Sequence, residues 1–209
     1  MSKNSSFIAM SDFMTSLFMI FLLLTVVLLT EVSRLSINED SAKKTRIELL
    51  GELQTEFAQD LPKWDAQILD DLTLRFKNPD LMFAIGKADV RPEFKAVMDS
   101  FLPRYFAIIT KPRFKPYIKE LRIEGHTSAL WALGTDSKTA YLLNMELSQK
   151  RALSTLAYTL QNAGDNYDWL VANLYSIGLS SSKPIDVSVN DIRNQRVEFK
   201  INLIGNNAK

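Results

Sequence analysis

Residues 13–30 read FMTSLFMIFLLLTVVLLT and contain no charged residue, no glycine and no proline. Extended back to Phe7, the apolar stretch has about 24 residues, which an α-helix at ~1.5 Å per residue carries over ~36 Å. A bilayer core of ~30 Å needs roughly 20 residues. The chain is therefore expected to contain a single N-terminal transmembrane helix over residues 7–30, preceded by a short cytoplasmic tail at residues 1–6.

A cleaved signal peptide is the main alternative to an uncleaved membrane anchor. The segment before the apolar run carries one lysine, and the run is longer than the ~7–15 residues of a signal-peptide core. The sequence that follows, LLTEVSRLS at residues 28–36, has no small-x-small cleavage pattern. These features favour the anchor.

The charges beside the span give no firm orientation. Lys3 lies on one side, whereas Arg34, Lys43, Lys44 and Arg46 lie near the other end. A strict count would place the C-terminal side in the cytoplasm. A very short tail has little influence on the orientation of the helix in the membrane, so the orientation has to be inferred from the nature of the C-terminal domain.

One carboxylate, Asp12, lies inside the apolar stretch, where a charge costs at least ~2.5–3.5 kcal/mol on insertion scales. Asp12 could cap the helix beside Ser11, but that would leave the apolar residues 7–10 outside the helix. It could instead face a partner helix and carry ions. Thr15 and Ser16 follow at i+3 and i+4, on the same helix face, where they could hydrogen-bond the carboxyl or help coordinate a cation.

Composition excludes several classes of protein. Lys plus Arg is 25 and Asp plus Glu is 24, so the chain lacks the basic excess typical of nucleic-acid binding. The chain has no cysteine, which excludes disulfides, thiolate catalysis and cysteine-ligated zinc. It has one histidine, which excludes metal sites built on several histidines. No constellation of carboxylates or metal ligands predicts an enzyme.

Residues 31–69 are expected to form a helical linker. Residues 31–46 are polar and charged, and an apolar seam spaced by three and four residues follows from Ile47 to Ile68. The seam could pair in a dimer or pack on the C-terminal domain. Pro62 is predicted to break the helix, with Asp60 capping a second short one.

Residues 70–209 alternate between strand and helix patterns. Strands are predicted at 72–76, 117–125, 170–179 and 196–204, and helices at 91–110 and 141–164, with a turn at 78–80 and a loop at 129–140. Pro92 is expected at the first helical position, and Gly164 at a helix C-cap. The pattern predicts an α+β fold in which helices cover one face of a mixed sheet.

The N-terminal stretch resembles the membrane helix of the MotB family of stator subunits. Asp12, Phe13, Met14 and Thr15 match that family's Asp-apolar-Met-Thr pattern, although its usual preceding Trp is missing. The resemblance implies that Asp12 carries the transported H⁺ or Na⁺, with Thr15 and Ser16 beside it, and that no cofactor is needed. It also implies a dimer of this chain inside a ring of MotA/ZorA-like A subunits.

The C-terminal region resembles the OmpA-like peptidoglycan-binding domain. The blocks GHTS at 125–128, NMELSQKRA at 144–152 and NQRVE at 194–198 match the family's three blocks in order. The resemblance implies that Arg151 grips a stem-peptide carboxylate. Thr127, Ser128 and Asn144 would supply neutral hydrogen bonds, and Leu147 would pack beneath Arg151.

The sequence departs from this family at two positions. Ser128 replaces the Asp that in the family helps hold the diaminopimelate of the stem peptide, and Gln195 replaces an Arg. Asp136, in the long loop that follows, could substitute for the missing carboxylate. Arg196 could line the rim of the site or form a cross-strand ion pair, and His126 is expected to be structural.

These resemblances imply a wall-anchored, ion-carrying B subunit in the bacterial inner membrane, with the C-terminal domain in the periplasm. Its partners would be the A-subunit ring, a second copy, peptidoglycan and membrane lipid. The short chain and the GHTS variant resemble the B subunits of Zorya anti-phage systems more than flagellar ones. A flagellar-type stator subunit, or a plain wall anchor without ion transport, is the alternative.

Overall fold

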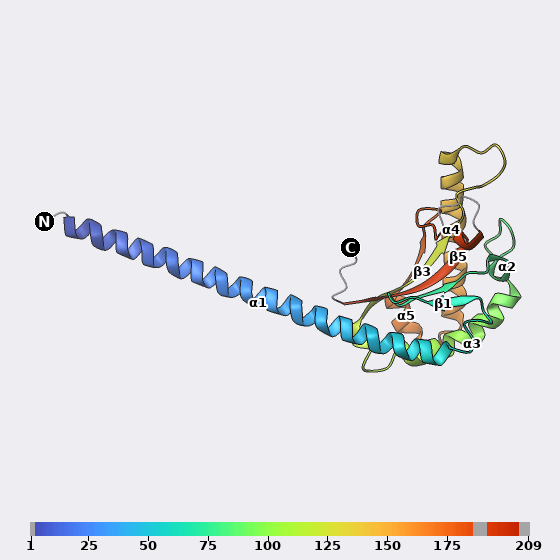
Figure 1. Cartoon of the computed structure of the whole chain (residues 1–209), viewed down its shortest axis with the longest axis horizontal. Coiled ribbons are helices and arrows are strands. Elements are labelled where there is room, and N and C mark those ends of the chain that lie inside the picture. The colour runs from blue at the N-terminus through green and yellow to red at the C-terminus, as the bar shows by residue number, and fades with distance from the viewer. Residues whose placement is uncertain (1–2, 186–191, 205–209) are drawn as a thin grey trace.

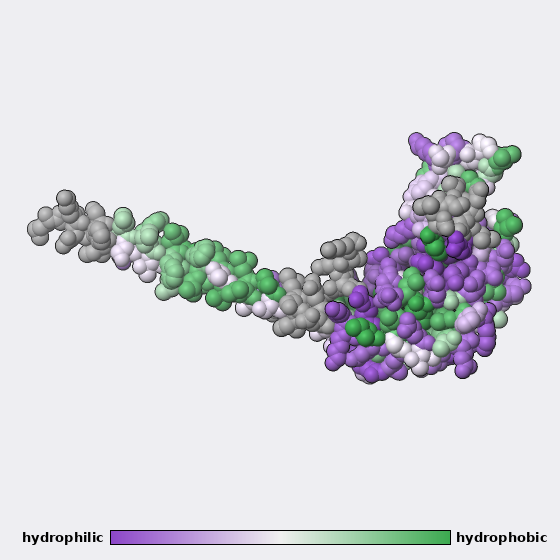
Figure 2. Space-filling view, in the orientation of Figure 1, coloured by the Kyte–Doolittle hydropathy of each residue, from purple (hydrophilic) through white to green (hydrophobic). Residues whose placement is uncertain are grey.

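The computed structural model describes residues 3–185 and 192–204 of the chain. Its longest element is helix α1 (Lys3–Phe57), a 55-residue rod that projects from the C-terminal domain (Figure 1). Within α1, Met10–Ser33 form a 24-residue stretch of mean hydropathy 2.5 that lies entirely exposed. This stretch is the continuous apolar surface along the rod in Figure 2, as expected of a single membrane-spanning helix.

The linker does not begin a separate element, because α1 continues without a break from the apolar span to Phe57. Leu49, Leu53 and Phe57, spaced by four residues, are buried in the core of the C-terminal domain, whereas Ile47 is 61% exposed. Of the two roles open for the apolar seam, the structure shows packing on the domain. The end of α1 is therefore part of that domain.

The second short helix predicted after Pro62 is wrong. Residues 58–65 form turns, and strand β1 (Ala66–Ile68) follows. Asp60 does not cap a helix, because its carboxylate accepts a hydrogen bond from Arg104 at 2.7 Å. The folded sheet therefore starts slightly before residue 70, at its edge strand β1.

The sheet has the order β1-β2-β5-β3-β4 and confirms the predicted mixed topology. Its other strands are β2 (Thr73–Phe76), β3 (Ile118–His126), β4 (Leu174–Gly178) and β5 (Arg196–Leu203). Strands β3 and β4 pair in parallel, and the remaining neighbours are antiparallel. The central pair, β3 and β5, sets Glu124 opposite Glu198 and His126 opposite Arg196.

The helices of the domain are α2 (Pro79–Met82), α3 (Pro92–Ile109), α4 (Ser137–Gln161) and α5 (Tyr167–Asn173), with short 3-10 turns at Lys115–Tyr117, Gly164–Asn166 and Ile192–Asn194. Pro92 is in the first turn of α3, as predicted. The turn predicted at 78–80 is instead the capped start of α2, because Asn78 accepts a hydrogen bond from the amide of Leu81.

Three further boundaries differ from the prediction. Helix α4 begins four residues early because Asp136 caps it, and its C-cap is Asn162 rather than Gly164. Gly164, with φ of 53°, instead opens a 3-10 turn. Strand β4 begins only at Leu174, since residues 167–173 extend the preceding short helix.

The two faces of the sheet differ in chemistry. The inner face carries apolar side chains such as Phe76 and Phe199, which contact Phe101 of α3 at ring-centroid distances of 5.8 and 5.4 Å. Helix α4 packs on the same face, against β3 and β4. The outer face carries alternating charged residues, among them Glu124 and Glu198. Helices thus cover one face, and the α+β prediction is confirmed.

Candidate functional site

Asp12, the predicted ion-carrying residue, lies exposed on the apolar part of α1. Thr15 and Ser16 are one turn further on the same side of the helix. The hydroxyl of Thr15 donates to the carbonyl of Ser11 at 2.8 Å, which leaves its oxygen lone pairs available. The structure therefore groups the three predicted residues, and their side chains face outward from the single chain, where a partner helix could meet them.

The motif that is predicted to bind the wall is built around a close contact between β3 and α4. A Cβ added at Gly125 would lie 2.2 Å from the carbonyl oxygen of Ser148, and one at Gly178 would lie 2.5 Å from the amide nitrogen of Gln149. Only glycine allows the helix backbone this close to both strand ends. The glycine of the GHTS block is thus explained by packing.

Three predicted residues meet where the strand ends. The amide of Thr127 donates to the carbonyl of Ser180 at 3.0 Å. The carbonyl of Leu130 accepts from Asn144 Nδ2 at 3.0 Å and from Ser128 Oγ at 3.4 Å. Asn144, which was expected to supply a neutral hydrogen bond to the stem peptide, therefore binds the chain's own loop. Thr127 is 2% exposed, and its hydroxyl has no hydrogen-bond partner within the described residues.

Arg151 lies two turns beyond Asn144 on the buried side of α4, or ~10 Å further along the helix axis. Its Nε donates to the carbonyl of Lys87 at 2.9 Å and its Nη2 to that of Ala84 at 3.5 Å, and its guanidinium stacks 4.9 Å from the ring centroid of Phe83. Arg151 is only 4% exposed.

Within the part of the chain that the structure describes, Arg151 has no acidic partner. Across residues 3–185 and 192–204, no carboxylate lies within ion-pair distance of its guanidinium. Burial alone lowers the pKa of Arg151 to about 10, so the group is still fully charged at neutral pH. A buried cation bound only to neutral groups attracts an anion, and a carboxylate would match its planar fork of donors.

Leu147 is partly buried one turn before Arg151, as the predicted packing requires. Asp136 lies elsewhere. Its carboxylate caps α4 by accepting from the amides of Lys138 and Thr139 at 3.1 and 3.0 Å. Fifteen residues separate it from Arg151, which is ~22 Å along a helix. The start of α4 and its preceding loop project beyond the sheet (Figure 1). As the N-cap of α4, Asp136 is not close to Arg151.

Arg196 lies on the outer face of the sheet and forms an ion pair. Its Nε donates to Glu198 Oε1 at 2.6 Å, and its Nη2 donates to the carbonyl of Lys183 at 2.9 Å. Arg75, on the neighbouring strand, donates to the same Glu198 oxygen at 2.6 Å. Of the two roles open for Arg196, the structure shows an ion pair, within its own strand rather than across strands.

A buried polar group on this outer face was not predicted from the sequence. Glu124, His126 and Glu198 are 3%, 1% and 5% exposed, and each offers one possible ligand atom to a shared point. Burial lowers the pKa of His126, against the opposing effect of Glu198. Burial alone would raise the pKa of Glu198, but His126 and Arg196 bring it well below its usual range. The sequence signal that could have indicated this group is the two-residue spacing of Glu124 and His126, which places both side chains on one face of a strand.

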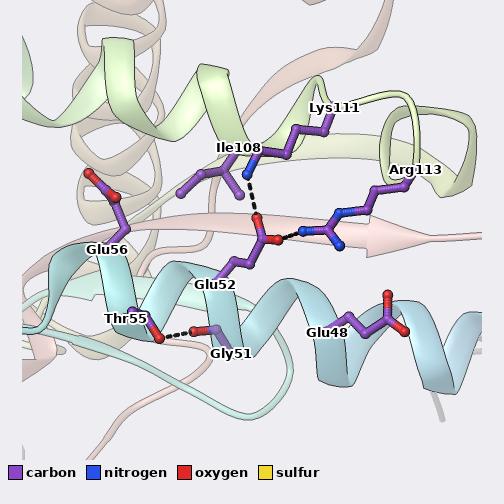
Figure 3. Close-up of a pocket in the computed structure, with 8 residues that line it drawn as sticks. All are labelled: Glu48, Gly51, Glu52, Thr55, Glu56, Ile108, Lys111 and Arg113. Atoms are coloured by element: carbon purple, nitrogen blue, oxygen red, sulfur yellow. Dashed lines mark hydrogen bonds and ion pairs between the residues drawn. The ribbon is translucent and has the colours of Figure 1, made fainter.

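Charged side chains line a groove between α1 and the segment that follows α3 (Figure 3). They connect the C-terminal end of the membrane helix to the domain. Glu52 lies between two cations there, accepting from Lys111 at 2.8 Å and pairing with Arg113. One turn later, Arg104 of α3 donates to Glu56 and Asp60, both at 2.7 Å. These pairs, together with the buried apolar stripe of α1, fix the end of the rod against the domain.

No protein-family model matches the chain. The Zorya protein ZorB of Escherichia coli is 33% identical to it over 208 residues, which cover 95% of this chain and 88% of the relative. A solved MotB-like protein from Desulfovibrio vulgaris superimposes with a TM-score of 0.59 at 20% identity, over 82% of this chain and 99% of that one. The cell wall anchor of the T6SS from Pseudomonas aeruginosa gives 0.52 at 21%, over 72% and 96%.

The two solved structures establish a MotB-like fold for the C-terminal domain. The similarity to ZorB extends over nearly the whole chain. On this evidence the chain belongs to the ZorB family of Zorya proteins.

Proposed function

We propose that the chain is the ion-carrying, wall-anchored B subunit of a stator-like membrane motor in Zorya anti-phage defence. One observation carries the proposal: a single uninterrupted helix has Asp12 in its exposed apolar part and its last turns buried in the core of a binding domain. The ion-carrying group and the anchoring domain then lie near opposite ends of one helix.

The anchor would bind peptidoglycan through Arg151. Its uncompensated guanidinium suits a stem-peptide carboxylate, and the unpartnered hydroxyl of Thr127 offers a further polar contact. Access to Arg151 requires a shift of the exposed loop 84–87, whose carbonyls now accept its hydrogen bonds. Because Ser128 cannot neutralise an ammonium group and Asp136 lies far away, we expect weaker binding than in OmpA-like domains that have the Asp.

The ion path would run past Asp12. In the assembled motor, A-subunit helices would surround the exposed apolar span and desolvate the carboxylate, with the oxygens of Thr15 and Ser16 beside the passing H⁺ or Na⁺. Wall binding would place the domain in the periplasm, leaving the amino terminus in the cytoplasm. A B subunit held by the wall cannot turn, so protonation of Asp12 would act on the surrounding A subunits.

The proposal can be tested by measuring phage protection in cells that carry the complete defence system with variants of this chain. Asp12→Asn and Arg151→Met should each abolish protection while the chain still reaches the membrane. Two controls remove a charge from the same helices outside the proposed sites. Glu31→Gln, at the far end of the span, and Lys150→Met, beside Arg151 but solvent-exposed and paired with Glu146, should keep protection.

Full protection by Asp12→Asn would refute ion carriage and leave a plain anchor. Full protection by Arg151→Met would refute the wall site.

A further inference from the structure

Three possible ligand atoms converge on the outer face of the sheet, away from α4 and Arg151. Glu124 and His126 of β3 and Glu198 of β5 have ligand atoms within 4.8 Å of one another. His126 Nε2 lies 3.8 Å from Glu124 Oε2 and 3.6 Å from Glu198 Oε2. Both separations are too long for hydrogen bonds. The strand register, which sets Glu124 opposite Glu198, holds the group together.

His126 is nearly inaccessible to solvent. It is 1% exposed, and neither ring nitrogen has a hydrogen-bond partner in the part of the chain that the structure describes. Buried polar nitrogens are almost always paired with protein, water or an ion, so Nε2 requires a partner that the described residues do not supply as a hydrogen bond. Its Nε2 faces two carboxylate oxygens, and a cation between the three atoms would satisfy all of them.

The two oxygens of Glu198 already have separate roles. Its Oε1 accepts from Arg75 and Arg196, both at 2.6 Å, whereas its Oε2 is the atom facing His126. Outer groups that fix a ligating carboxylate in this way are typical of metal sites. The two arginines balance the charge of Glu124 and Glu198, so the site with a neutral imidazole is close to electroneutral before a cation binds.

The spacing fits a small transition-metal ion. Ligand atoms at ~2.0–2.2 Å from a tetrahedral ion lie ~3.3–3.6 Å apart, close to the two separations of 3.8 and 3.6 Å from His126 Nε2. A cavity of about 290 Å³, lined by Glu124 and Glu198 among others, borders the group and leaves room for a water as the remaining ligand. An imidazole nitrogen with carboxylate oxygens favours Zn²⁺ over Mg²⁺ or Ca²⁺.

We propose that Glu124, His126 and Glu198 bind one divalent cation, Zn²⁺ by preference, that fastens β3 to β5. His126 directly precedes Thr127, so the ion would fix the strand end from which the predicted wall-binding residues extend. The site lies on the opposite face of the sheet from Arg151 and would bind its ion whether or not the domain binds peptidoglycan.

The test uses the full chain without a histidine tag, in detergent, stripped with a chelator and titrated with ZnCl₂ or MnCl₂. We expect one Zn²⁺ per chain and a melting temperature raised by roughly 5–10 °C at a hundredfold excess over Kd. Because His126 is the sole histidine of the sequence, selective labelling of histidine gives one imidazole signal in NMR spectra. That signal should shift on Zn²⁺ addition and return on chelation.

Glu124→Gln and His126→Gln should lose the bound ion and the Zn²⁺-dependent rise in melting temperature. The matched control is Glu120→Gln, which removes a carboxylate from the same strand and face but one bound to Asn202 rather than to the cluster. It should bind Zn²⁺ as the wild type does. No stoichiometric Zn²⁺ in the wild type, an unshifted His126 signal, or equal binding by Glu124→Gln would overturn the site.

Discussion

Replacing Arg151 with Met should separate wall binding from stability. Met has a similar length, no charge and a favourable contact with an aromatic ring, here Phe83. A stem-peptide carboxylate would lose a charge-assisted bond of ~1.5–3 kcal/mol, which lowers affinity roughly 10- to 150-fold. Loss of binding should therefore be easy to detect.

The effect on folding should be small. Burial lowers the pKa of Arg151 from 12.5 to about 10. At ~1.36 kcal/mol for each pKa unit, this corresponds to roughly 3 kcal/mol disfavouring the buried cation. Removing that cost offsets the two lost hydrogen bonds to backbone carbonyls and the stacking on Phe83, which together contribute about 2–4 kcal/mol. The net change in stability should lie within ~1 kcal/mol, or a few °C in melting temperature.

Sedimentation of the detergent-solubilised chain with isolated sacculi measures binding, and thermal melting measures stability. Lys150→Met is the control and should leave both unchanged. Unchanged sedimentation of Arg151→Met would refute the role of the guanidinium in wall binding. A fall of more than ~10 °C in melting temperature, far beyond the expected few degrees, would show instead that Arg151 is a structural residue.

Three further predictions concern the domain. Ser128→Asp should increase sedimentation with sacculi, because it restores a carboxylate able to neutralise an ammonium group. Gly125→Ala should prevent stable folding of the domain, seen as loss of a cooperative melt, since its Cβ would lie 2.2 Å from the carbonyl oxygen of Ser148. Arg104 lowers the pKa of Asp60 below its usual 3.8, so this pair stabilises the fold above pH ~4 and is lost as the pH falls further. Asp60→Asn should therefore weaken the pH dependence of melting below that value.

Most of the fold could be predicted from local pattern. The charge-free run at 13–30 predicts the apolar part of α1, and the alternation in RVEFKINLI places every second residue of β5 in the core. The continuity of α1 could not be predicted, because the polar residues 31–46 suggest a linker. Helix α1 continues because the sequence has no proline before Pro62 and because Leu49, Leu53 and Phe57 pack in the core of the domain.

Some residues of the sites could be predicted from the sequence, and others could not. The motif spacing was enough to name Arg151, but its lack of a counterion depends on which residues the fold places around it. Asp136, in the long loop after Ser128, was considered as a substitute for the carboxylate missing at that position, whereas in the structure it caps helix α4. Glu124 and Glu198 have alternation typical of a solvated strand face, and their burial arises only when β3 and β5 pair.

The central claim, that Asp12 carries ions, is tested most directly by ion flux. The chain is co-reconstituted with its A subunit into vesicles, and dye signals report H⁺ or Na⁺ entry under an imposed gradient. We predict flux of one of these ions with the wild type and with Glu31→Gln, and none with Asp12→Asn at equal incorporation. Equal flux through vesicles carrying the wild type and Asp12→Asn would contradict the claim.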